Sequence, residues 1–250
     1  MRQWGNLIRS AVVAILPLSV MRCGVLSDPH PAFQPTAVTF VSADEGWILG
    51  HRESCGKASC GELFHTTDGG HSWRKSAPPP FGVTRLVFAD SRNGWAYYSG
   101  TSVGRERELY STHDGGGSWD RVSVPVGVAS TEWTDPVISD GTVQIALFDP
   151  RISEARMLSS PVGVDTFTAS QPFRIDVAAS THRSVYVELG LTRAGSSSWF
   201  VVTVSSPDNS QSPAGGARFV DGNWSPWTLP CVNPNPPRLA AVSPTDLFVS

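Results

Sequence analysis

Two sequence patterns recur in the same order in the first half of this chain, and their spacing constrains the fold more than any other feature. A Phe at residue 40 with a Gly-Trp pair at 46–47 recurs 48 positions later, as a Phe at residue 88 with a Gly-Trp pair at 94–95. A Thr-x-Asp-Gly-Gly-x-Ser-Trp run occurs at residues 66–73 and again at 112–119, 46 positions later. Two unrelated patterns that recur at nearly one period indicate an internal structural repeat.

Each repeat predicts four short strands. In the first unit we expect strands over residues 37–41, 46–51 and 62–66, and a fourth that begins at Ser72. Polar, glycine-containing turns separate these segments, and short strands at regular spacing predict an all-β fold. Four strands in a unit of about 45 residues is the size of one blade of a β-propeller.

The repeated Asp-Gly-Gly turn has a mechanical explanation. An aspartate in a turn can accept backbone N–H groups two residues further on, and glycine adopts positive φ without a Cβ clash. The tryptophan that follows is expected to fold back onto the sheet as an apolar anchor. The residues expected to build the two turns are Asp68, Gly69, Gly70, Trp73, Asp114, Gly115, Gly116 and Trp119.

Weaker copies of the repeat follow. A third unit has an expected strand at residues 141–148, and Phe167 takes the place of the turn tryptophan. A fourth unit has expected strands at 184–189 and 199–205, and residues 239–248 resemble the start of the first unit. After a leader at 1–30, we therefore expect an incomplete or open propeller of about four and a half blades at 31–250. The expected blade limits are 37–80, 81–128, 129–170, 171–230 and a partial blade at 231–250.

The Asp-Gly-Gly runs resemble the Asp-box of BNR-repeat β-propellers. The Phe and Gly-Trp start is most similar to the subgroup that contains photosystem II assembly factors and exported bacterial propellers. The clear match covers residues 37–122 and continues in degenerate form to 250. The box also occurs in sialidases, sortilin-type receptors and xyloglucanases, so the resemblance implies a fold and no single function. In that family the box lies at the outer edge of a blade, which implies a structural role for Asp68 and Asp114.

The first residues are typical of a secretory signal peptide. Two arginines precede a short apolar run at residues 11–21, which is too short for a membrane-spanning helix of about 20 residues. Residues 21–22 do not fit the small residues that a lipobox needs before Cys23, so lipidation is not expected. We expect a secreted or envelope-associated protein that could reach a membrane only through its leader or a lipid anchor. A misassigned start codon is the alternative.

Four cysteines bear on the same question. Cys55 and Cys60 lie five residues apart in a polar stretch, which in an exported chain predicts a small disulfide. A metal site would need further cysteine or histidine ligands at suitable spacing, so no metal is expected. Cys231 would pair either with Cys23 or with a cysteine outside this chain.

Charge and motifs exclude several functions. The net charge of −3 gives no electrostatic case for nucleic-acid binding. Metalloprotease, phosphate-loop, nucleophile-elbow and dinucleotide motifs are missing from the sequence, and no cofactor is expected. Residues 173–176 resemble the Phe/Tyr-Arg-Ile-Pro motif of sialidases, but they lack the proline and follow both boxes, so we interpret Arg174 as an ordinary strand residue. Tyr186 and Glu188 alternate on one face of a strand, without further residues to complete a site.

Aromatic residues outside the repeat positions suggest a ligand face. The candidates are Tyr97, Tyr98, Trp133 and Trp227; packing between blades is the alternative, and we favour it. The histidines of the Asp-Gly-Gly hairpins, His65, His71 and His113, are expected at solvated turn positions. We thus expect an exported, non-catalytic propeller that binds or scaffolds a protein or glycan through its loop-lined face. The alternatives are a glycoside hydrolase of exo-sialidase type and an assembly factor for a membrane protein complex.

Overall fold

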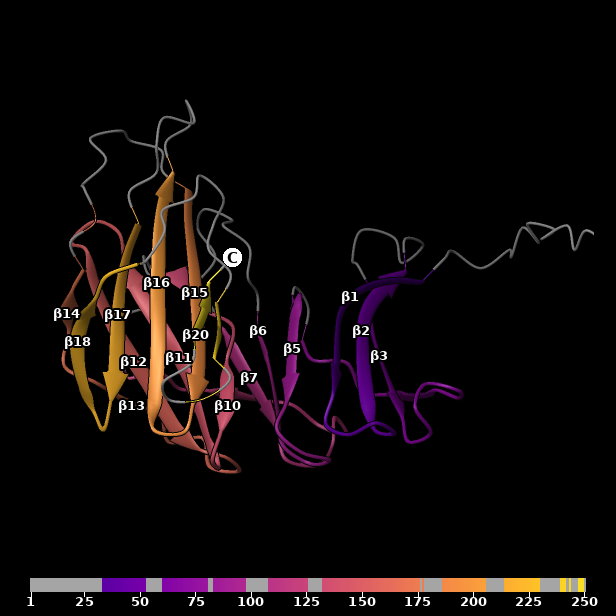
Figure 1. The fold of residues 1–250 in the computed structure, drawn as a ribbon. Helices are drawn as coiled ribbons and strands as arrows, with labels where there is room; N and C mark the ends of the chain where they lie inside the picture. Colours follow the sequence, from indigo (N-terminus) through magenta and orange to yellow (C-terminus); the bar gives the residue numbers. More distant parts are fainter. Residues whose placement is uncertain are drawn as a thin grey trace, which may run out of the picture. The chain divides into compact units, whose positions relative to one another are not determined.

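The computed structural model describes residues 33–52, 60–80, 83–97, 108–125, 132–175, 177, 186–205, 214–229, 239–241, 243 and 247–249. All the strands within these ranges belong to one compact unit, Ala32–Ser250. The described chain is all-β, and Figure 1 shows its strands arranged as consecutive antiparallel sheets. None of the described segments is a helix long and apolar enough to cross a membrane.

The first two sheets are simple four-stranded antiparallel meanders. The first consists of β1 (Phe33–Phe40), β2 (Gly46–Arg52), β3 (Cys60–Thr66) and β4 (Arg74–Ser76). The second consists of β5 (Arg85–Phe88), β6 (Gly94–Tyr97), β7 (Leu109–Thr112) and β8 (Asp120–Val122). Gly46 pairs with Phe40 in the first sheet as Gly94 pairs with Phe88 in the second, so the sequence repeat is also a repeat of strand register.

Both edge strands of the third sheet are interrupted. It consists of β9 (Glu132–Trp133), β10 (Val137–Ser139), β11 (Thr142–Asp149), β12 (Glu154–Pro161), β13 (Thr168–Ala169) and β14 (Phe173–Arg174). β9 and β10 pair in series with β11, and β13 and β14 pair in series with β12. Pro136 and Pro172 stand between the halves, where a residue without an N–H group interrupts the ladder. The sheet is therefore a blade whose inner and outer strands are each broken once.

The fourth sheet has the longest strands. It consists of β15 (Tyr186–Ala194), β16 (Ser197–Ser205), β17 (Ala214–Val220) and β18 (Asn223–Trp227). A two-stranded sheet of β19 (Leu239–Ala241) and β20 (Leu247–Val249) follows and contacts β15. The expected fold class is confirmed. The chain is an all-β protein of the β-propeller type, built from four-stranded blades, and among the described residues the sheets do not close into a ring.

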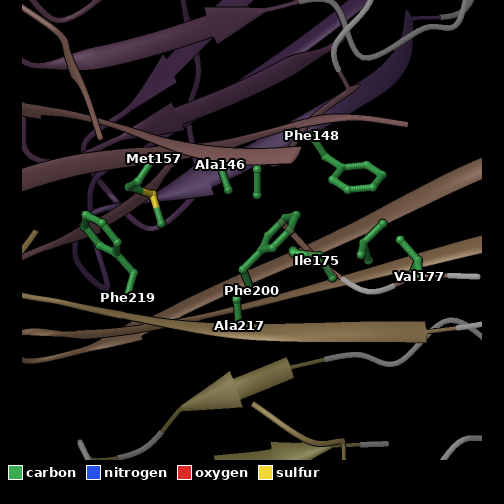
Figure 2. Packing of buried hydrophobic residues seen from close by; sticks show 10 residues of the cluster. Ala146, Phe148, Met157, Ile175, Val177, Phe200, Ala217 and Phe219 are labelled. Carbon is green, nitrogen blue, oxygen red and sulfur yellow. The ribbon is translucent and has the colours of Figure 1, made fainter. Parts of the chain in front are cut away.

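Successive sheets are held together by apolar clusters on alternating faces. In β6, Ala96 packs in the cluster shared with the first sheet, whereas Trp95 packs in the cluster shared with the third. In β11, Ile145 packs toward the second sheet and Phe148 toward the fourth. Each large apolar side chain buried in this way contributes roughly 1.5–3 kcal/mol. Figure 2 shows the last cluster, whose members include Ala146, Phe148, Met157, Phe200, Ala217 and Phe219.

One tryptophan joins the first two sheets through both stacking and hydrogen bonding. The fully buried Trp47 stacks on Phe88 of the next sheet with ring centroids 3.8 Å apart and planes within 3°. Its other face stacks on His65 at 4.5 Å. Its indole Nε1 donates to the carbonyl of Gly115, 3.0 Å away, in the second Asp-Gly-Gly turn. The turn of one blade thus receives the core tryptophan of the blade before it.

The corresponding tryptophan of the second sheet lacks this hydrogen bond. Trp95 is also fully buried, but its Nε1 has no hydrogen-bond partner among the described residues. The third sheet has no Asp-Gly-Gly sequence between β12 and β13. The degenerate turn therefore provides apolar packing for Trp95 without an acceptor carbonyl.

This difference predicts unequal effects of the same substitution. Trp47→Phe and Trp95→Phe both remove part of a buried ring, but only Trp47→Phe leaves the Gly115 carbonyl without its donor. We expect Trp47→Phe to lower the free energy of unfolding by about 1 kcal/mol more than Trp95→Phe. Urea unfolding of the two variants measures this difference, and equal losses would contradict the hydrogen-bonding role.

Candidate functional site

The first Asp-Gly-Gly turn is a closed hydrogen-bond network centred on Asp68. Its Oδ1 accepts from the Thr66 hydroxyl and from the Ser72 N–H, each at 2.8 Å, and its Oδ2 accepts from the Ser72 hydroxyl at 2.6 Å. The expectation of an N–H two residues further on is wrong, because the donor lies four residues on. Gly69 and Gly70 have φ of 69° and 89°, which turns the chain so that the Ser72 amide points back at the carboxylate.

The second turn repeats this network almost atom for atom. Asp114 accepts from the Thr112 hydroxyl at 2.8 Å, and from the N–H and hydroxyl of Ser118 at 2.9 and 2.7 Å. Gly115 and Gly116 again have positive φ, of 74° and 88°. Hydrogen bonds from the serines lower the pKa of both Asp68 and Asp114 to about 2. The two carboxylates are thus held as anions by their own hairpins, an arrangement that suits a stabilising role.

A polar cluster links the second and third sheets beside the second turn. His113 lies with Nδ1 2.8 Å from Asn93 Oδ1 and with Nε2 3.0 Å from Asp165 Oδ2. The Ser111 hydroxyl donates to the same Asp165 oxygen at 2.5 Å. Since serine and histidine both contact the carboxylate, this is not the order in which a histidine takes the serine proton. The cluster connects blades and does not activate a nucleophile.

The three hairpin histidines differ in their surroundings. His71 is exposed on its turn, as expected. His65 and His113 are half-buried, so the prediction of solvated turn positions is wrong for them. His65 stacks on Trp47, and Asp165 of the third sheet reaches His113. Among the described residues, no group of three or more histidine, cysteine, aspartate and glutamate side chains is arranged to hold a metal ion.

A cavity of about 390 Å³ lies between the third and fourth sheets, beside the tight turns that join β15 to β16 and β17 to β18. Met157 and Phe219 supply its large apolar surfaces. Its polar lining is rich in hydroxyl groups and consists of Thr142, Gln144, Ser159, Thr168, Ser170, Arg193, Ser196 and Asp221. Residues from both sheets and from two turns therefore converge on one polar space.

Arg193 is the cationic group of this cavity. Its Nε donates to the carbonyl of Gly195 at 2.9 Å, which fixes the side chain against its own hairpin turn. Its Nη1 is buried and has no hydrogen-bond partner among the described residues. Arginine keeps its positive charge at neutral pH, and a ligand carboxylate in the cavity could pair with this guanidinium.

Hydrogen bonds also fix the neighbouring polar side chains. Gln144 accepts from the Ser198 hydroxyl at 2.5 Å and donates to the Ser159 hydroxyl at 3.4 Å. The Ser170 hydroxyl accepts from the Trp224 indole at 2.9 Å. The bonds of Gln144 to Ser198 and of Ser170 to Trp224 cross between the third and fourth sheets, so the cavity wall is held in place before any ligand arrives.

The described aromatic candidates for a ligand face, for which packing between blades is the favoured interpretation, do not line this cavity. Tyr97 and Trp133 are 2% and 7% exposed and belong to the core cluster between the second and third sheets. They are therefore not surface contacts, because the inward faces of β6 and β9 carry them into that core. Trp227 is half-buried in β18 and its ring lies over Gly216. Tyr98 lies outside the described residues.

Other residues singled out from the sequence are also away from the cavity lining. Arg174 is exposed in β14 and Glu188 is exposed in β15. Tyr186 begins β15, and its side chain lies outside the described part of the chain. The predicted disulfide also falls outside it: Cys60 is described only as the first residue of β3, and the other three cysteines are in undescribed segments.

Comparison with known proteins gives no family. No family model matches the chain, and no curated protein matches it. Among solved structures, it is similar to YCF48 bound to D1 peptide, at 18% identity over 90% of this chain and 76% of that one, with a TM-score of 0.42. A protein of unknown function from Dyadobacter fermentans is 12% identical over 89% and 72% of the two chains, with a TM-score of 0.47. The GH74 xyloglucanase of Xanthomonas campestris is 12% identical over 86% and 43%, with a TM-score of 0.43.

The turn networks predict a measurable contribution from a buried hydroxyl. Thr112 is 2% exposed, donates to Asp114 and accepts from the Gly116 N–H at 2.9 Å. Thr112→Val keeps the shape and removes both bonds, so we expect a loss of about 1–2 kcal/mol in the free energy of unfolding. Thr67→Val, at an exposed position in the first hairpin, is the control and should change it by less than about 0.5 kcal/mol. Equal effects in urea unfolding would argue against the network.

The lowered pKa values predict an acid-sensitive contribution to stability. Folding lowers the pKa of Asp68 and Asp114 from 3.8 to about 2. Their stabilisation is therefore fully present above about pH 4 and is lost as the pH falls toward 2. The double variant Asp68→Asn/Asp114→Asn should be less stable than wild type at pH 7, and its stability should fall less between pH 5 and pH 2. Thermal unfolding across this range measures the slope, and parallel curves would refute the assignment.

Proposed function

We propose that this protein is an exported, non-catalytic binding module that takes a small polar ligand with one anionic group in the cavity between its third and fourth sheets. The observation that carries the proposal is the position of Arg193, a permanently charged side chain in the wall of a cavity that is otherwise lined mainly by hydroxyl groups. Export rests on the signal-peptide pattern of residues 1–30.

The size and lining of the cavity support a ligand of about one sugar ring. Its volume of about 390 Å³ lies at the lower end of the range of small-molecule sites. The hydroxyl groups around it can donate or accept, and so can pair with ligand hydroxyls of either sense. Met157 and Phe219 offer apolar surface for the C–H face of a ring. A small hydroxylated acid satisfies all three features together.

The same lining argues for binding rather than glycoside hydrolysis. Most glycosidases place two carboxyl groups on either side of the bond that they cleave. Among the described residues of the cavity, Asp221 is the one carboxylate. Asp68 and Asp114, whose pKa values are lowered to about 2, are held within their own hairpins.

A matched titration tests the proposal. Binding of glucuronate and of glucose to the full chain is followed by NMR, for wild type and for Arg193→Gln and Arg174→Gln. We expect glucuronate to bind more tightly than glucose, and Arg193→Gln to weaken glucuronate binding about tenfold or more, since a hydrogen bond to a charged group contributes about 1.5–3 kcal/mol. Arg174→Gln removes an exposed arginine of the third sheet and should leave binding unchanged.

Two results would overturn the proposal. Equal affinity of wild type and Arg193→Gln for glucuronate, or no binding of any acid in a panel of hydroxylated carboxylates, would exclude the cavity as an anion site. Turnover of a fluorogenic sialoside that disappears in Arg174→Ala would replace the binding module with the exo-sialidase hypothesis.

A further inference from the structure

The first sheet carries a copy of the aromatic pair that receives Trp47 in the second sheet. In the second sheet, Phe88 meets Trp119 edge to face at 6.1 Å and 82°. In the first sheet, Phe40 meets Trp73 at 6.4 Å and 81°. The two pairs occupy the same positions of the sequence repeat and have closely similar ring distances and angles. Their indole contacts differ: the N–H of Trp73 donates to the Gly70 carbonyl of its own turn, whereas that of Trp119 donates to the Ala77 carbonyl after the first sheet.

The copy in the second sheet shows what such a pair binds. Trp47 lies flat on Phe88, which is 5% exposed, and the Trp47 indole donates to the Gly115 carbonyl. The pair and the adjoining turn therefore form a seat for one tryptophan, with a flat aromatic surface and a carbonyl acceptor at its edge.

The copy in the first sheet is uncovered. Phe40 is 46% exposed, Trp73 is 37% exposed and the neighbouring Val38 is 61% exposed. Gly69 stands where Gly115 stands in the second turn, with a φ of 69° against 74°. Exposed large apolar groups that gather in one patch mark an interaction site more often than scattered ones do.

The stacking surface of this site is already in place. A Cβ on Gly46 would come within 2.6 Å of the Phe40 ring, and a Cβ on Gly94 would come within 2.8 Å of the Phe88 ring. Each ring thus lies directly over the glycine of the neighbouring strand, and only glycine leaves room for it. Because the ring is held in the same orientation in both sheets, a ligand meets little cost of ordering it.

We propose that the seat formed by Val38, Phe40, Gly69 and Trp73 binds a tryptophan-bearing extended segment of a partner polypeptide. The tryptophan ring stacks on Phe40, and its indole N–H donates to the Gly69 carbonyl. The occupant is specified by the internal copy, where the ring, the N–H donor and the flanking Gly-Trp-aliphatic sequence all come from β2. This site is separate from the Arg193 cavity and does not rest on the function proposed for it.

A peptide with the sequence of β2 is the natural probe. Fluorescein-labelled Gly-Trp-Ile-Leu-Gly-His-Arg is titrated with the full chain, and binding is measured by fluorescence anisotropy. We expect saturable binding to wild type and at least tenfold weaker binding to Phe40→Ala. Ile152→Ala, which removes a side chain that is 54% exposed on the third sheet, is the matched control and should bind as wild type does. Arg193→Gln should also bind the peptide normally.

Changes in the peptide separate stacking from hydrogen bonding. Replacement of its tryptophan by alanine should abolish binding, whereas 1-methyltryptophan keeps the ring, removes the N–H and should weaken binding measurably. If Phe40→Ala loses its fold by circular dichroism, Phe40→Leu replaces it, since leucine keeps apolar bulk without a flat ring.

Three outcomes would overturn the proposal. The first is no saturable binding of the peptide to wild type, and the second is equal binding to wild type and to the folded Phe40 variant. The third is a concentration-dependent dimer of the wild type that Phe40→Ala abolishes and the peptide does not disrupt, which would assign the patch to a second copy of this chain.

Discussion

The stack of Trp47 on Phe88 is the contact on which the arrangement of the first two sheets depends. It joins two sheets by a flat aromatic contact, and the hydrogen bond to Gly115 fixes the tryptophan against the turn of the next blade. The geometry explains why the patterns recur together in the sequence. The ring needs a glycine beneath it, and the turn needs two positive-φ glycines to present its carbonyl, so Phe, Gly-Trp and Asp-Gly-Gly must repeat as a set.

Where the chain departs from this set of repeated residues, in its third and fourth sheets, polar groups replace part of the apolar packing between blades. The turn after β12 lacks the Asp-Gly-Gly sequence, and Trp95 has no acceptor for its indole. Proline interrupts the inner and the outer edge strand of the third sheet. Beyond this sheet, the interface with the fourth is part apolar cluster and part hydroxyl-lined cavity, with Arg193 at its wall. The regular half of the chain is thus dominated by packing, and the degenerate half holds the polar space that a ligand can fill.

The sequence was sufficient for the elements whose signals are local. The positive-φ glycines and the four-stranded blades follow from turn residues and alternating apolar positions. It was insufficient where distant residues meet. Asp165 lies 52 residues from His113, and Gln144 lies 54 residues from Ser198, so neither contact leaves a pattern in the chain. Tyr97 and Trp133 stand outside the repeat, so the sequence left a ligand face open beside the favoured packing between blades, and the faces of β6 and β9 bury both residues. No sequence motif marks Arg193, and it is recognisable as part of a cavity wall only once the third and fourth sheets are placed together.

The central claim is that a buried indole, that of Trp47, links the first two sheets through a hydrogen bond to the turn of the next blade. Hydrogen exchange of the tryptophan indole N–H groups in ¹⁵N-labelled protein tests it directly, with Trp47→Phe and Trp73→Phe used to assign the two resonances. Trp47 is fully buried and Trp73 is 37% exposed, so the Trp47 signal should persist in D₂O long after that of Trp73 has disappeared. Exchange of Trp47 as fast as that of Trp73 would contradict the account.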